Sequence, residues 1–180
     1  MKIKLTWLEE KNTCEEGIEY FISNELEGIE DVDLVKKLFE EKKYNWASWL
    51  LTRLFDKTNN VKYAVYSAEL VLPIFEKKHP KDDRPRKAIE AAKNWLANPT
   101  NAAAAAAAAY AAAYAAADAA DAAYAAYVAA DVDAADAAAS AAYAAYAAAD
   151  VDADAAAAYA YRKIIEYGIN LLREVDHEKL

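Results

Sequence analysis

Alanine dominates residues 101–160 of this 180-residue chain, where tyrosine and aspartate are almost the only other residues. Alanine has the highest helix propensity, whereas glycine and proline weaken or break helices. After Pro99 the chain contains one glycine, Gly168, and no proline. These features predict an all-α protein. The uninterrupted apolar run at 102–117 is shorter than the roughly 20 residues that a membrane span needs, so no span is expected.

A repeat with an offset of 19 residues organises part of this stretch. "AAYAAYVAADVDAADAAA" at 122–139 aligns with "AAYAAYAAADVDADAAAA" at 141–158. In each unit two tyrosines and an aspartate stand at i, i+3 and i+7, so a helix would carry them on one face. Aspartate is poor inside helices and good at their N-termini, which favours turns near 131–133 and 150–152. One or two longer helices are the alternative.

The tyrosines of the repeat have two interpretations. They fill the space that small alanines leave between helices, or they form an exposed recognition surface, because tyrosine contributes large contact area with little loss of entropy. The aspartates are either solubilising surface residues or an acidic face for a partner. The tyrosines and aspartates that we expect to contact a protein partner are Tyr124, Tyr127, Asp131, Asp133, Tyr143, Tyr146, Asp150 and Asp152.

Shorter amphipathic segments precede the alanine-rich stretch. In "TCEEGIEYFISN", Ile18, Phe21 and Ile22 stand at helical spacing, and Thr13 is the expected N-cap. Similar apolar stripes follow up to Trp95 and return in "YAYRKIIEYGINLLREV" near the end. The pattern predicts an N-terminal helical module over 1–58 and an Ala/Tyr/Asp-rich helical domain over 59–180. We expect the whole to form an alanine-rich antiparallel helical bundle or array.

Charge is distributed unevenly along the chain, whose net charge is −9. Residues 1–100 carry 17 Lys and Arg against 18 Asp and Glu, a net charge of −1. Residues 101–180 carry 4 against 12, a net charge of −8. The second half therefore has no cationic surface for nucleic acid, and a cationic protein partner is the better expectation. The single cysteine, Cys14, allows no internal disulfide, and no signal peptide is evident, so we expect a cytoplasmic protein.

Arg84, Arg86 and Lys87 form the densest cationic cluster. One interpretation is a binding site for a small anion or phosphate, because guanidinium groups fit phosphate and helix N-termini favour negative charge. The other is structural: the arginines pair with acids such as Glu69 or Glu90 and hold the start of their helix.

Other chemistry is not expected. "DVDAAD" and "DVDAD" lack the central glycine and the terminal glutamate of a calcium loop. His79 and His177 are the only histidines, so neither a metal site nor acid–base catalysis is indicated. No lysine or arginine lies next to Cys14 to activate its thiol. The tryptophans are expected in the core, with one of them as a candidate interface anchor. We predict no cofactor and no enzyme activity.

One stretch resembles a known family. "YAVYSAELVLPIFEKKHPKDDRPRKAIEAAKNWLANPT" at 63–100, followed by Ala/Tyr/Asp helices, resembles the Imm-5-like immunity proteins of bacteria and phages. The most specific part is "DDRPRKAIEAAKNW". "WLEEKNTCEEGIEYF" and "WASWLLTRL" resemble a small helical module at the head of phage-encoded proteins. Family members often have arginine or histidine among the alanines, where this chain has tyrosine and aspartate.

The resemblance implies a non-catalytic protein that acts by binding. An immunity protein would neutralise a toxin, and a phage anti-defence protein would inhibit a host defence protein in the host cytoplasm. Two alternatives stay open: sequestration of a nucleotide-like anion at Arg84, Arg86 and Lys87, and a structural or scaffolding phage protein. A defined large homo-oligomer would favour the scaffold.

Overall fold

Seven helices make up the described part of the chain. The computed structural model describes residues 1–98 and 154–177. The helices are α1 (Leu5–Glu10), α2 (Glu15–Ser23), α3 (Asp31–Glu40), α4 (Tyr44–Leu54), α5 (Lys57–Lys78), α6 (Arg84–Ala97) and α10 (Asp154–His177). These residues contain no strand apart from an isolated bridge between Lys2 and Glu30. The all-α prediction is therefore confirmed. The 19-residue repeat and its turns lie mostly outside the described residues.

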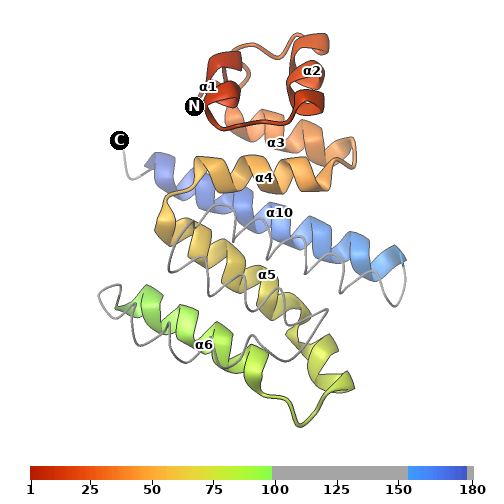
Figure 1. The fold of residues 1–180 in the computed structure, drawn as a ribbon, viewed down its shortest axis with the longest axis vertical. Helices are drawn as coiled ribbons and strands as arrows, with labels where there is room; N and C mark the ends of the chain where they lie inside the picture. Colours follow the sequence, from red (N-terminus) through yellow and green to blue (C-terminus); the bar gives the residue numbers. More distant parts are fainter. Residues whose placement is uncertain (99–153, 178–180) are drawn as a thin grey trace.

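The helices are stacked in an order that differs from their order in the sequence. Figure 1 shows α1 and α2 at one end, followed by α3, α4, α10, α5 and α6. The last described helix, α10, thus lies between α4 and α5, which are consecutive in the chain, and it packs against both. No helix among the described residues is long and apolar enough to cross a membrane.

One continuous hydrophobic core runs through this stack. The apolar stripe expected on α3 consists of Leu34, Val35, Leu38 and Phe39; the first three are buried and Phe39 is partly buried against the core. On α10, Ile164 and Ile165 are at most 1% exposed. The core joins residues from both predicted segments, 1–58 and 59–180, and the predicted boundary falls in the first turn of α5, just after the short connection between α4 and α5. The division into a module and a domain stays a prediction.

Two local expectations near α2 are wrong. Ile22 is 55% exposed and does not share the buried face with Phe21, which is 3% exposed. Thr13 does not cap α2, because Cys14 holds the N-cap position and the Thr13 hydroxyl donates instead to the backbone carbonyl of Leu8, at 2.7 Å. The threonine therefore closes the end of α1 rather than opening α2.

A close crossing places α10 against α4 and α5. Gly168 is buried, and a Cβ atom built on it would lie 2.6 Å from Leu51 Cδ1 and 2.9 Å from Tyr63 Cε2. Both neighbours are 0% exposed, so they have little room to move. The Tyr63 hydroxyl is satisfied in this interior by a hydrogen bond with the Ser48 hydroxyl, at 3.0 Å. Glycine at 168 is therefore what allows the backbone of α10 to approach this closely.

Replacement of Gly168 by alanine is expected to destabilise the protein. Alanine gains about 1 kcal/mol of helix propensity over glycine, but overpacking a full core costs about 1–3 kcal/mol. Chemical denaturation followed by circular dichroism measures the change, with Asn170→Ala on the exposed side of α10 as the control. The double variant Gly168→Ala/Leu51→Ala should lose less unfolding free energy than the two single variants lose together, because the smaller side chain at 51 makes room for the added methyl group. A stabilised Gly168→Ala protein would contradict this packing.

Candidate functional site

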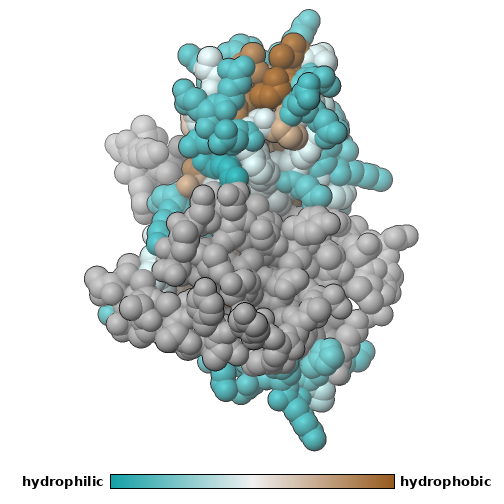
Figure 2. All heavy atoms as spheres, viewed as in Figure 1, coloured by the Kyte–Doolittle hydropathy of each residue, from teal (hydrophilic) through white to brown (hydrophobic). Residues whose placement is uncertain are grey.

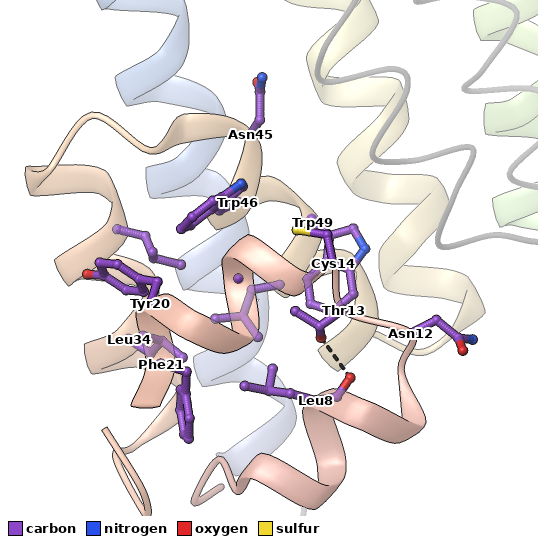
Figure 3. Close-up of a pocket in the computed structure, with 13 residues that line it drawn as sticks. Leu8, Asn12, Thr13, Cys14, Tyr20, Phe21, Leu34, Asn45, Trp46 and Trp49 are labelled. Carbon is purple, nitrogen blue, oxygen red and sulfur yellow. Dashed lines mark hydrogen bonds between the residues drawn. The ribbon is translucent and has the colours of Figure 1, made fainter. Parts of the chain in front are cut away.

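An open pocket of about 310 Å³ lies among the first four helices. Figure 3 shows side chains from the α1–α2 connection, α2, α3 and α4 around it. Its lining consists of Leu8, Asn12, Thr13, Cys14, Gly17, Tyr20, Phe21, Leu34, Leu38, Asn45, Trp46, Trp49 and Leu50. Most of these side chains are aliphatic or aromatic. Ligand pockets commonly span roughly 300–1,000 Å³, so this one is at the small end of that range.

Aromatic side chains and one lysine form the rim on the α2 side. The rings of Tyr20 and Trp46 meet edge to face with their centroids 5.5 Å apart. Lys43 Nζ lies 4.3 Å from the centroid of the Trp46 ring and 5.0 Å from that of Tyr20. A cation at such distances is attracted by the negative face of the ring. The protein's own lysine thus holds these two rings together.

A carboxylate shared by two donors extends this rim. Glu41 accepts a hydrogen bond from the Tyr20 hydroxyl, at 2.8 Å, and another from Lys37 Nζ, at 2.7 Å. The bond from Lys37 is the main reason why the pKa of Glu41 is lowered. The pKa of the Tyr20 phenol is raised, first by burial and then by its bond to the Glu41 carboxylate. The rim is therefore a connected polar network beside an apolar hollow.

The opposite side of the pocket brings together the start of α2 and the middle of α4. Figure 3 shows Thr13, Cys14 and Trp49 lying close together there. The thiol of Cys14 is free, and its residue is exposed. The hydroxyl of Thr13 already donates its proton to the Leu8 carbonyl, so this proton is not available to a ligand.

Sequence reasoning did not predict this pocket as a site. It found no basic neighbour to activate the thiol of Cys14 and placed the tryptophans in the core, with one as a candidate anchor. Trp46 and Trp49 stand three residues apart on α4, and both are partly buried. Their spacing was the available indication that they share one face. What faces them comes from α2, and nothing in the linear pattern shows that contact.

The predicted cationic cluster lies elsewhere, at the start of α6. Arg86 donates two hydrogen bonds of 2.8 Å to Glu76 at the end of α5, one from Nε and one from Nη2. Lys87 pairs with Asp83 one turn earlier, at 2.9 Å. An anion at Arg86 would therefore have to replace Glu76. Arg84 begins α6.

The acid that pairs with Arg86 differs from those expected. Glu69, one of the acids expected there, is bound by Lys93. Glu76 was not named from the sequence, because ten residues and a turn separate it from Arg86. The predicted partner-binding residues, 124–152, lie outside the described part of the chain. Within that part, no group of three or more His, Cys, Asp or Glu residues is placed to hold a metal ion.

Removal of the Glu41 carboxylate should have a pH-dependent effect on stability. A carboxylate whose pKa is lowered in the folded state stabilises the protein at pH values above its pKa in the unfolded state. This stabilisation is lost as the pH falls through the pKa of the folded state. We therefore expect Glu41→Gln to be less stable than the wild type at pH 7 and equal to it in acid. Urea denaturation across this pH range measures the difference, and Glu40→Gln, at the exposed end of α3, is the control. If Glu41→Gln stayed less stable than the wild type in acid, the ionised carboxylate of Glu41 would not be the source of the stabilisation.

The Arg86–Glu76 pair should contribute modestly to stability. Both side chains are partly exposed, at 53% and 32%, and exposed pairs typically contribute about 0.2–1 kcal/mol. A double-mutant cycle of Arg86→Ala and Glu76→Ala should give a coupling energy in this range, reduced at high salt. A coupling energy of zero would show that the two hydrogen bonds do not hold α5 and α6 together in solution.

Comparison with known proteins identifies the family. The family model described as Imm-5 like putative immunity protein matches residues 50–178. No curated protein and no solved structure matches the chain. Apart from Leu50, the residues lining the pocket precede the matched range. The match covers well over half of the 180 residues. The chain therefore belongs to the Imm-5 like immunity protein family, and this membership suggests an immunity-type role in which a protein partner is bound.

Proposed function

We propose that the protein neutralises a toxin or a host defence protein by binding it and blocking its action. Family membership over residues 50–178 is the observation that carries this proposal. The apolar and aromatic lining of the pocket supports it, because tryptophan and tyrosine are enriched where protein interfaces bind most strongly. Binding is sufficient for neutralisation, so the proposal requires no catalytic group.

Charge suggests which kind of protein is bound. The chain has a net charge of −9, and eight aspartates lie between 118 and 154. Oppositely charged partners associate faster, because the field of one steers the approach of the other. We propose that the partner is cationic and meets the tyrosines and aspartates of the repeat. The aspartates attract the partner and so raise the rate of association, and the tyrosines supply contact area in the complex.

Co-expression tests the function directly. The full chain is expressed together with each toxin-like gene beside its own gene, and with the defence systems of its host, while growth and survival are measured. Rescue of growth together with co-purification of a defined complex is the expected result. If every tested toxin and defence system stays fully active while the chain is well expressed, the proposal of neutralisation is wrong. A stable large homo-oligomer would then favour a scaffolding function.

The acidic face is tested by two matched variants of the full chain. Asp131, Asp133, Asp150 and Asp152 are changed together to asparagine. The matched control changes the other four aspartates of the stretch, Asp118, Asp121, Asp136 and Asp154. Both variants lose four negative charges. A difference between their association rates therefore depends on where the charges lie and not on the net charge.

We expect the first variant to associate with the partner at least about tenfold more slowly at low salt, with the rates converging at high salt. Stopped-flow or surface plasmon resonance measures the association rate. The association rate of the control variant should fall by a smaller factor. Equal slowing by both variants would show that net charge alone steers the partner, and no slowing by either would exclude an acidic contact.

A further inference from the structure

We propose that the pocket of the first four helices is a second contact site, which takes one bulky apolar side chain presented by a basic segment of the protein partner. This inference rests on the proposed function, since it needs a protein partner. It goes beyond the family, because the lining residues other than Leu50 precede the matched range. Residues 1–49 would thus add recognition to the family domain.

The size and chemistry of the pocket determine what enters it. At about 310 Å³ it is at the lower limit for whole small-molecule ligands and is better suited to one large side chain. Phe21, Leu34 and Leu50 provide buried apolar surface at its base, and the partly buried rings of Trp46 and Trp49 provide aromatic faces. An aliphatic or aromatic side chain would be desolvated there without leaving a buried polar group unpaired.

The same end of the molecule carries exposed apolar surface. Figure 2 shows hydrophobic side chains gathered among hydrophilic ones at the end formed by α1 and α2. Ile22 on α2 is one exposed apolar residue of this region, at 55%. A bound segment would therefore find exposed apolar surface at the same end of the molecule as the pocket. Apolar area of this kind, rimmed by polar residues, is typical of protein-binding sites.

Charge identifies the segment that bears the inserted side chain. Residues 1–49 carry 7 Lys against 12 Asp and Glu, a net charge of −5, whereas residues 50–98 carry 10 Lys and Arg against 6 acids, a net charge of +4. The lysines at the pocket are engaged: Lys37 binds Glu41, and Lys43 lies over the rings of Tyr20 and Trp46. Negative charge is therefore what this end offers to a partner.

Three carboxylates of α2 remain available. Glu15, Glu16 and Glu19 are exposed, and their carboxylates make no hydrogen bond or ion pair within the described residues. Glu16 stands one turn before Tyr20, so the two share a face of the helix at the pocket rim. Acidic residues also suit the first turn of a helix, but that preference does not require three of them beside an apolar pocket. A lysine or arginine flanking the inserted side chain would pair with them.

Synthetic peptides provide the first test. An amphipathic helical peptide with a central tryptophan and flanking lysines is compared with one whose centre is alanine and one whose flanks are glutamate. Binding is followed on the full chain by NMR of its own tryptophan indole N–H groups. Trp46 and Trp49 line the pocket, whereas Trp7 and Trp95 do not, so the chain contains its own controls.

We expect the lysine-flanked tryptophan peptide to shift the signals of Trp46 and Trp49 and to bind at least about tenfold more tightly than either comparison peptide. Glu16→Gln should weaken its binding more than Glu90→Gln on the distant α6. If the alanine peptide bound as tightly as the tryptophan peptide, or if the Trp95 signal shifted as much as those of Trp46 and Trp49, the proposal that the pocket is the binding site would be wrong. Equal affinity of the glutamate peptide would overturn the basic segment.

Filling the pocket provides the second test, and it uses the complete partner. Cys14→Phe places a ring at the pocket wall, and Ser23→Phe adds the same ring at the other end of α2, outside the lining. We expect the first variant to lose partner affinity at least about tenfold and the second to retain it. If Cys14→Phe does not fold, the folded wild-type chain is modified at its single thiol with N-phenylmaleimide, with methyl methanethiosulfonate as the small control.

These results separate the two proposals. If the blocked chain still neutralises the partner with unchanged affinity, the pocket inference is wrong and the proposed function stands. If no partner is neutralised while the lysine-flanked peptide still binds at Trp46 and Trp49, the proposed function is wrong and the pocket is a binding site for another basic protein.

Discussion

The crossing of α10 with α4 and α5 at Gly168 holds the described fold together. Without a side chain at this position, the helix backbone approaches Leu51 and Tyr63 closely enough to fill the space between two helices that are neighbours in sequence. Tyr63 is fully buried there and keeps its hydroxyl paired with Ser48. Helices on both sides of the crossing thereby share one core, which includes residues from the start and from the end of the chain.

This arrangement also separates two kinds of surface. At one end of the stack, α5 and α6 are joined by Arg86–Glu76 and Lys93–Glu69, so Arg86 and Lys93 are each compensated by an acid of the neighbouring helix. At the other end, α2 carries carboxylates that make no ion pair with any other residue that the structure describes, next to an apolar pocket. Paired charges mainly orient helices, whereas unpaired charges beside an apolar hollow are available to a partner. The pocket is therefore a better candidate for recognition than the cationic cluster.

The sequence was informative about the candidate site only in part. The cluster of Arg84, Arg86 and Lys87 was visible as a run of charges, but Glu76, the partner of Arg86, became apparent only when α5 and α6 were placed side by side. The pocket was missed for a related reason. Its wall combines Cys14 and Tyr20 with Trp46 and Trp49, and the pairing of α2 with α4 depends on how α3 turns the chain between them.

The uneven charge was counted directly from the amino-acid order, and the family was recognised by resemblance to known sequences. Local physical chemistry, readable in the same order, determined the helical class and the apolar stripes on α3 and α10. These properties depend on propensities and on spacings of three and four residues, which act within one helix. Only the tertiary structure decided that α10 lies between α4 and α5, that Ile22 faces outward and that Thr13 binds Leu8 instead of capping α2. Such outcomes depend on which surfaces meet, and contacts between residues distant in the chain leave no periodic pattern in the sequence.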